Sequence, residues 1–493
     1  MSEKNFNIEN DKEFDALIES SLGELPPDYL TDEVTPWRRA TSRVIWGLAL
    51  KMMVLEVLGL NYILPFIGTV MSLLGFRALR RENKWFKACN ILNIIYSVSY
   101  FISVVLDTTV FDYGELASKI IIAVDITVFL LLLICLWQAF KAVRRKVGLP
   151  NGAKSAAALI IWYAILVCLG LINYQGVIIP ILMIILFILM IRSLLKLSKE
   201  LGEAGYAINA APVRVSDRAF AITVCSIIVV CIVCGYVFFS SYPMKWEETP
   251  KTETAQITEI KENLLELGFP EDILNDISDE DVLECEGALL VVCSEDYYHY
   301  LSEANELRIR GVAVRLPGDG DNWKIFHHFI WLDGPKFYGT EGIQIWISTQ
   351  EWEPNGEASG RILYDEEGKT YSTSYYSLSI ENTGYTLEAN VYAGFSMPDG
   401  GESHRGYVSY SLINSTPDSW FIDTRIAYTH PSDLSALLRY PLMTALDQNK
   451  ASGGNTDGSF DAVNEWFQLF IDPDTGEVDV IGETEDSEDF EYY

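Results

Sequence analysis

Apolar residues form long runs before about residue 242 and short, alternating segments after it. A bilayer core of about 30 Å requires roughly 20 mostly apolar residues per helix. The runs that approach this length predict about seven membrane-spanning helices, at 42–59, 61–76, 88–106, 117–138, 156–173, 176–193 and 219–241. The first two are short and closely joined by "LGLNYILP", so residues 42–76 form either two spans or a re-entrant hairpin. Both alternatives return the chain to the side that it left.

The second half has the pattern of a β domain. Nine short segments, from "ALLVVC" to "WFIDTRIAYT", are rich in β-branched and aromatic residues and are separated by turns such as "PGDGDN". We therefore predict an antiparallel β-sandwich of jelly-roll type over residues 288–480. Residues 242–287 predict a polar stalk with short helices, in which Ser278 and Asp281 form an N-terminal cap. A late helix in "PSDLSALLRYPLMTAL", a hairpin at "DPDTGE" and an acidic disordered tail at 481–493 complete this prediction.

The charges of the two halves differ and indicate an orientation. Residues 1–241 contain 22 Lys and Arg and 19 Asp and Glu, whereas residues 242–493 contain 14 and 49. This break places a domain boundary near residue 242, after a transmembrane domain at 41–241. Basic residues gather before the first span and after the second, fourth and sixth, while the alternate loops carry almost none. The positive-inside rule then predicts a multi-pass plasma-membrane protein with a cytoplasmic N-terminus and an extracytoplasmic C-terminal domain.

Three ionisable residues interrupt the predicted spans: Lys51, Glu56 and Asp125. Lys51 and Glu56 are five residues apart and do not stack on one helix face, but Lys51 and Asp125 could meet at a similar depth. Charges inside a bilayer are costly and often functional, which makes these residues the weak candidates for a proton or ion step. We favour the alternatives of a structural pair or a snorkelling lysine.

Residues 1–40 form an acidic segment in which Phe14, Leu17, Ile18 and Leu22 have helical spacing. A helix of this length is marginal alone, so we expect residues 1–36 to dock on basic loops of the same chain, on a cytoplasmic protein or on a second copy.

The stretches "GELPPDYLTDEVTPWRRATSRVIWGLAL" and "LNYILPFIGTVMSLLGFRALRRENKWFKACNIL" carry a resemblance to a family. Over roughly the first 100 residues the chain resembles uncharacterised multi-span membrane proteins of clostridial-type Gram-positive bacteria, with a looser likeness at "GFPEDILNDISDEDVLECEGA" and "RILYDEEGKTY". The resemblance implies a bacterial plasma membrane, and it provides no catalytic residues.

The outer domain offers little catalytic chemistry. His327 and His328 are adjacent on a strand, so we expect them to point to opposite faces and not to share a metal. "DPDTGEVDVIGE" has partial calcium-loop spacing, but Gly476 fits a hairpin turn better. Acidic residues lie near Trp331, Trp346 and Trp352, which is expected by chance in so acidic a domain. We therefore expect no catalytic site, metal or cofactor, and we lean against an enzyme.

Cys285 and Cys293, the two outer cysteines, are close enough along the chain to form a disulfide outside the cell. The expected partners are the lipid bilayer, a cytoplasmic protein, and an extracellular ligand or envelope glycan, with no nucleic acid. We favour a sensor or signalling protein in which an outer ligand-binding β domain acts through the spans on the cytoplasmic helix. The first alternative is a transporter or permease subunit that uses Lys51, Glu56 and Asp125. The second is a membrane-anchored envelope-binding module.

Overall fold

The structure is a computed structural model of the whole chain. It describes residues 36–53, 60–150, 152–172, 174, 176–208, 215–249, 254–302, 305–318, 321–333, 336–337, 339–348, 352–382, 389–414, 420–432, 441–453, 459–472 and 475–481. These residues divide into two compact units. The first comprises residues up to 105 together with 112–232, and the second comprises 106–111 together with 233 onward.

The first unit is helical, as the long apolar runs predict. Its helices are α3 (Pro36–Met52), α4 (Leu60–Leu79), α5 (Lys84–Leu106), α6 (Gly114–Lys146), α7 (Lys154–Leu171), α8 (Ile178–Glu203) and the first part of α9 (Asp217–Phe239). Six of the described helices, α4 to α9, are long and apolar enough to cross a membrane. The prediction of a helical membrane domain is confirmed.

The remaining described helix of this unit, α3, is not among these six candidate spans. It has only 17 residues and packs antiparallel against α4. Glycines make this contact close. A Cβ added to Gly68 would lie 2.5 Å from the carbonyl oxygen of Gly47, and a Cβ added to Gly75 would lie 2.6 Å from the Val44 side chain. Small residues at helix contacts allow backbones to approach in membranes. The run at 42–76 is therefore a tight helix pair whose connection, residues 54–59, lies outside the described residues.

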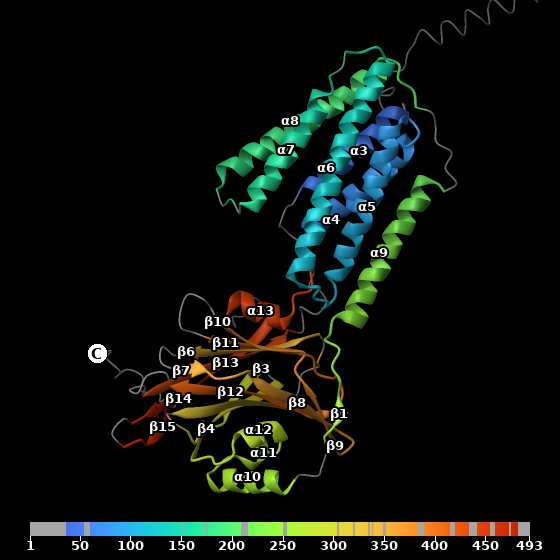
Figure 1. Cartoon of the computed structure of the whole chain (residues 1–493). Coiled ribbons are helices and arrows are strands. Elements are labelled where there is room, and N and C mark those ends of the chain that lie inside the picture. Colours follow the sequence, from blue (N-terminus) through green and yellow to red (C-terminus); the bar gives the residue numbers. More distant parts are fainter. Residues whose placement is uncertain are drawn as a thin grey trace, which may run out of the picture. The chain divides into compact units, whose positions relative to one another are not determined.

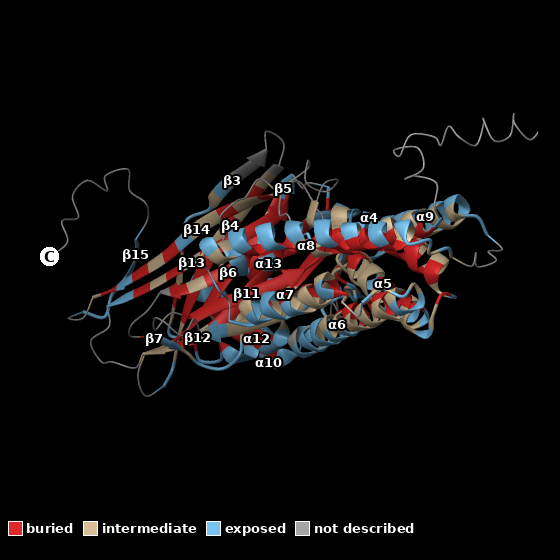
Figure 2. Cartoon of the chain, turned by 90° about the horizontal axis from the view of Figure 1, so that it is seen from above, coloured by how far each residue is buried: buried red, intermediate tan, exposed pale blue. Residues whose placement is uncertain are grey.

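The surfaces of these helices suit a lipid environment. Buried side chains such as Trp37, Phe86 and Phe140 pack between the helices, while large aliphatic side chains on α8, including Ile178 and Ile184, remain more than half exposed. Figure 2 shows this pattern as a pale-blue outer side along α8. Apolar surface of this extent is stable where lipid replaces water. The chain is thus a multi-pass membrane protein with a separate β domain.

The β domain consists of two antiparallel sheets. The nine-stranded sheet has the order β1–β9–β8–β12–β5–β4–β2, with β3 paired to β4 and β7 paired to β12, and the six-stranded sheet has the order β10–β11–β6–β13–β14–β15. Strands of the first sheet are β1 (Glu247–Glu248), β2 (Leu290–Cys293), β3 (Tyr297–Ser302), β4 (Asn305–Leu316), β5 (Asn322–Asp333), β7 (Trp352–Pro354), β8 (Ser359–Glu366), β9 (Lys369–Ser374) and β12 (Glu402–Asn414). Strands of the second are β6 (Glu341–Ser348), β10 (Ser377–Asn382), β11 (Ala389–Phe395), β13 (Phe421–Pro431), β14 (Phe460–Ile471) and β15 (Val478–Ile481). The β-sandwich prediction is confirmed.

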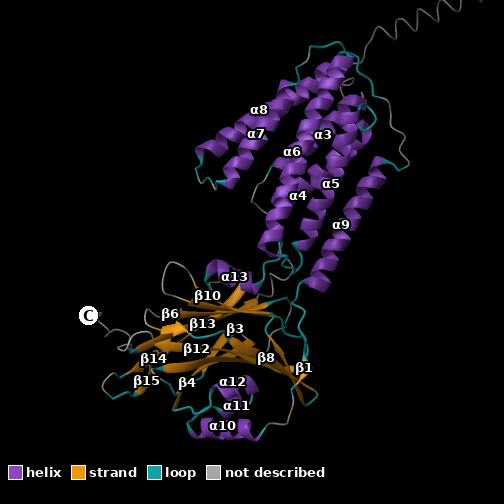
Figure 3. Cartoon of the chain, in the orientation of Figure 1, coloured by secondary structure: helices purple, strands orange, loops and turns teal. Residues whose placement is uncertain are grey.

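Helices cover the outer side of each sheet in Figure 1, and Figure 3 shows the same layers by secondary structure. Three short helices form the cap: α10 (Ala255–Glu266), α11 (Glu271–Leu274) and α12 (Asp279–Glu284). The cap packs on the nine-stranded sheet through an apolar cluster that includes Ile260 and Phe326. The six-stranded sheet carries α13 (Ala445–Ser452), which begins at a capping box of Thr444 and Asp447. The nine-stranded sheet is therefore buried on both faces.

The end of the domain matches the sequence prediction in part. The β14–β15 hairpin is present, and Gly476 has a φ of 70° in its turn. Part of the predicted late helix at 431–446 lies outside the described residues; at its ends, β13 includes Pro431 and α13 begins at Ala445. Residues 433–440 and the predicted tail from 482 onward lie outside the described residues.

Candidate functional site

The intramembrane candidate Lys51 lies in a buried polar cluster. Its Nζ donates to Oδ1 of Asn93 at 2.9 Å and lies 4.8 Å from the centre of the Tyr96 ring. Ser72 Oγ donates to the same Asn93 oxygen at 3.1 Å. The side chains come from α3, α4 and α5, and Lys51 is only 7% exposed. An amide oxygen and an aromatic ring therefore receive this ammonium group.

Asp125 lies near this cluster, where its charge acts on Tyr96, but it forms no described hydrogen bond or ion pair with Lys51. Asp125 on α6 is hydrogen-bonded to Ser99 of α5, and its Oδ1 has no partner within the described part of the chain. Instead, α5 provides a separate polar partner to each residue, Asn93 to Lys51 and Ser99 to Asp125. Glu56 lies outside the described residues.

The adjacent histidines of β5 point to opposite faces, as predicted. His327 faces the sandwich core, where its Nε2 lies 3.2 Å from the Tyr410 hydroxyl, and burial lowers its pKa to about 3. His328 faces the cap, where its Nε2 lies 2.9 Å from Asp276 Oδ2. Among the described residues, no group of three His, Cys, Asp or Glu side chains could hold a metal ion.

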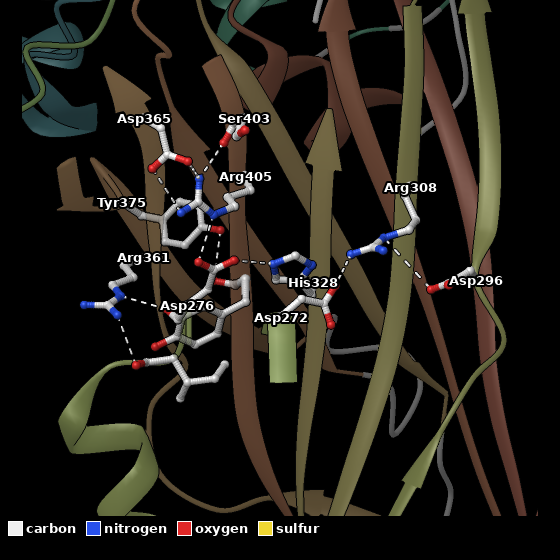
Figure 4. A network of polar contacts seen from close by, with 12 residues as sticks. Asp272, Asp276, Asp296, Arg308, His328, Arg361, Asp365, Tyr375, Ser403 and Arg405 are labelled. Atoms are coloured by element: carbon white, nitrogen blue, oxygen red, sulfur yellow. Dashed lines mark hydrogen bonds and ion pairs between the residues drawn. The ribbon is translucent and has the colours of Figure 1, made fainter. Parts of the chain in front are cut away.

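A charged network joins the cap to the sheet at Asp276 (Figure 4). The Asp276 carboxylate accepts from His328 of β5 and, at 2.8 Å, from Nε of Arg405 of β12. Arg361 of β8 donates to the carbonyl oxygens of Asp276 and Ile277. Burial alone would raise the pKa of Asp276, but the hydrogen bonds and charges of His328 and Arg405 outweigh it and lower that pKa.

A second network is centred on Asp281, at the start of α12. Its carboxylate accepts from Lys324 at 2.7 Å, from the Tyr407 hydroxyl at 2.6 Å and from Ser359 and Ser409. Lys324 also pairs with Glu284. Alternate residues of a strand share a face, so Lys324 and His328 on β5, and Arg405, Tyr407 and Ser409 on β12, all point to the cap. The two networks fix the cap on the sheet.

The outer face of the six-stranded sheet carries the polar–aromatic row, defined as Asn390, Trp346, Arg425 and Trp466. These residues are in register on the adjacent strands β11, β6, β13 and β14. The Arg425 guanidinium lies 4.9 Å from the Trp346 ring and 5.2 Å from the Trp466 ring. Trp466 is 43% exposed. The row therefore presents aromatic surface on both sides of a cation.

Several polar atoms along this row lack partners. Among the described residues, Oδ1 of Asn390, Oδ1 of Asn464 and Nε of Arg425 have no hydrogen-bond partner, and Asn390 is only 4% exposed. An unpaired buried polar atom costs about 1–3 kcal/mol. Donor and acceptor atoms of this kind beside aromatic rings are typical of a site for a polar small molecule.

Tryptophans that look alike in the sequence have different positions. Trp331 and Trp352 are buried in the sandwich core, whereas Trp346 lies on the outer face. The signal that separates them is register, because Trp346 alternates with the buried Ile345 and Ile347 of β6. This alternation is visible in the sequence and distinguishes Trp346 from the buried tryptophans.

The two outer cysteines are free thiols in the structure. Cys285 is buried at the end of α12, and the Cys293 thiol lies 3.8 Å from the carbonyl oxygen of Gly268. The disulfide that the spacing allowed is not formed.

No protein-family model matches the chain, and no curated protein matches it. Among solved structures, the chain is similar to a collagen-binding domain from a Staphylococcus aureus adhesin, with a TM-score of 0.19 and 10% identity over 31% of this chain and 90% of that one. It is similar to a pore forming protein with a TM-score of 0.19 and 8% identity, over 39% of this chain and 96% of that one.

Proposed function

We propose that the chain is a membrane-bound sensor whose β domain is extracytoplasmic and binds a ligand on the polar–aromatic row. The observation that carries this proposal is the in-register placement of Asn390, Trp346, Arg425 and Trp466, with unpaired polar atoms beside the two indole rings. The alternation of basic and non-basic loops supports the extracytoplasmic placement.

The chemistry of the row favours an uncharged glycan. A sugar ring has an apolar face that can lie on an indole, and hydroxyl groups that both donate and accept hydrogen bonds. Asn390 and Asn464 provide unpaired acceptors, and Arg425 provides an unpaired donor. These atoms lie beneath the surface, so the flexible Arg425 side chain has to shift for a hydroxyl to reach them. The excess of acidic residues in the second half disfavours a polyanion.

Binding is tested with the full chain in lipid nanodiscs, because sugar-based detergents would compete for the row. The probes are soluble hexasaccharides of glucose and of N-acetylglucosamine, measured by calorimetry. We expect Trp466→Ala to weaken binding by about fivefold or more, as for a central aromatic contact. Tyr298→Ala, which removes a 47% exposed aromatic side chain of the nine-stranded sheet, should leave binding unchanged. Equal loss in both variants, or no binding by the wild type, would remove the glycan assignment.

Sensing requires that binding is transmitted to the cytoplasmic segment. A cysteine placed in that segment (Ser20→Cys) is labelled from the inside of proteoliposomes, with and without saturating oligosaccharide outside. We expect the labelling rate to change in the wild type and to stay constant in Trp466→Ala. If the oligosaccharide binds without any change in the labelling rate, the sensor function is excluded and the function of an envelope-binding module remains.

Transport is a second candidate, favoured by the burial of Lys51 without an acidic partner among the described residues. Ionisable residues inside a membrane frequently serve ion or proton movement. Proton or ion flux in proteoliposomes tests this function. A flux that persists in Lys51→Met and Asp125→Asn, or no flux in the wild type, excludes the role given to these residues.

A further inference from the structure

A cavity with basic and aromatic walls lies between α3 and α8 in the helical unit. It has a volume of about 740 Å³ and is lined by Arg38, Arg39, Ser42, Arg43, Trp46, Leu195 and Ser198. This volume lies within the usual range of small-molecule sites, about 300–1,000 Å³. We call it the α3–α8 cavity.

The helices on both sides of the cavity are firmly placed. The indole nitrogen of Trp37 donates to the Ser198 carbonyl oxygen at 3.1 Å, and the hydroxyls of Thr41 and Ser198 lie 2.5 Å apart. Both Trp37 and Thr41 are fully buried. The wall formed by α3 is therefore fixed against α8, and the cavity is part of the folded unit.

The walls change from basic to apolar along the helix axis. Arg38, Arg39 and Arg43 occupy the first two turns of α3, and Trp46 follows roughly 12 Å further along from Arg38 at 1.5 Å per residue. On α8, the residues that precede Leu195 in the same direction include Ile188 and Leu189, which are about half exposed. The cavity thus opens from a cationic end onto the apolar, lipid-facing side of the helices.

We propose that the α3–α8 cavity binds a phospholipid with an anionic headgroup. Arginine forks suit phosphate oxygens, and basic pockets between membrane helices bind anionic headgroups. Tryptophan is favoured at the level where headgroup and acyl chain meet, which is the place that Trp46 takes. The acyl chains then follow the exposed aliphatic side of α8.

The acidic residues 1–35 are the competing occupant, since they precede α3 directly and could neutralise the same arginines. The lipid fits better because the arginine end continues onto exposed aliphatic surface of α8, which needs a long apolar partner. This inference is independent of the ligand of the β domain.

Native mass spectrometry of the full chain in detergent tests the proposal, with phosphatidylglycerol and phosphatidylcholine of identical acyl chains as probes. We expect the wild type to prefer phosphatidylglycerol. Replacing Arg38 and Arg39 together by glutamine should remove this preference, because each arginine is expected to raise the affinity for phosphatidylglycerol by about fivefold. Lys141→Gln with Arg145→Gln removes the same charge outside the cavity and should retain the preference. Arg39→Lys, which keeps the charge, should retain most of it.

Several outcomes would overturn the proposal. Equal affinity for the two lipids in the wild type would show that the headgroup is not recognised. An unchanged preference in the Arg38 and Arg39 double variant would place the lipid elsewhere. Binding of glycerol phosphate as tight as that of the lipid would exclude an acyl-chain contribution. If only a chain lacking residues 1–35 binds phosphatidylglycerol, the acidic segment occupies the cavity instead.

Discussion

Lys324 of the β domain and Lys51 of the helical unit are both more than nine-tenths buried, but their partners differ. Lys324 meets the carboxylates of Asp281 and Glu284, and four hydroxyl groups also donate to Asp281. Lys51 meets an amide oxygen and a tyrosine ring. The β domain fixes its cap by charge pairing, whereas the helical unit tolerates a cation through neutral dipoles and close helix packing.

The largest expected effect is in the β domain. Lys324→Met removes the cation that pairs with Asp281 and leaves a buried carboxylate uncompensated, which should lower the free energy of unfolding by about 3–5 kcal/mol. The midpoint is measured in urea by modification of the buried Cys285 thiol, located by mass spectrometry. Lys369→Met breaks the exposed pair with Glu248 and should not shift the midpoint. Equal midpoints for Lys324→Met and wild type would refute the role of charge pairing.

Close packing in the helical unit is tested at Gly68. Gly68→Val places side-chain atoms against the Gly47 carbonyl of α3, and overpacking of this kind should cost about 1–3 kcal/mol. Resistance of the reconstituted chain to unfolding by dodecyl sulfate is the measurement. Gly170→Val in α7, at a position where a Cβ meets nothing within 4 Å, is the matched control. If both variants resist equally, the α3–α4 contact does not limit stability.

The buried His327 gives the β domain a defined acid sensitivity. Its folded pKa is about 3, below the unfolded value of about 6.5, so the unfolded chain binds one more proton as pH falls. Stability present above pH 6.5 should decline below it, by up to about 1.4 kcal/mol per pH unit.

His327→Phe should remove this part of the slope between pH 6.5 and 4.5, where most carboxyl groups are still ionised. Urea unfolding followed by the fluorescence of buried tryptophans measures the slope. Burial also lowers the pKa of His404, so His404→Phe should flatten the curve in the same direction. A slope that His327→Phe does not change would contradict the neutral, buried state of this imidazole.

The smallest effect is expected at Lys51. Lys51→Met removes a charge that has no acidic partner among the described residues, and Asn93 keeps the hydrogen bond from Ser72. Stability in dodecyl sulfate should stay within about 1 kcal/mol of wild type or rise, as for many buried charges replaced by apolar side chains. A loss of stability as large as that in Lys324→Met would show that Lys51 has a strong partner. It would contradict the difference drawn here between the two lysines.

Periodic patterns in the sequence predicted most of the fold. The run at 88–106 lies within α5, and "NWKIFHHFIWL" forms β5, because apolar spacing directly records which face is buried. The helix N-terminal hydrogen bond between Ser278 and Asp281 was also predicted, because the two residues are only three positions apart. The capping box of Thr444 and Asp447 carries a similar short-range signal in the sequence for the start of α13.

The polar sites could not be predicted in this way. Asp276 and Asp281 lie in an acid-rich stretch beside the exposed Asp279 and Glu280, and nothing local distinguishes the buried pair. Their partners Arg405 and Lys324 are 129 and 43 residues away. The same holds for Lys51, whose partner Asn93 follows 42 residues later. Only strand register and helix packing bring these groups together.

The sensor account depends most directly on the side of the membrane that holds the β domain. Protease added to intact cells that express the chain with an epitope at residue 1 tests this placement. We expect the β domain to be trimmed while the N-terminal epitope remains attached to the membrane helices. A β domain that stays intact until the cells are opened would contradict the account.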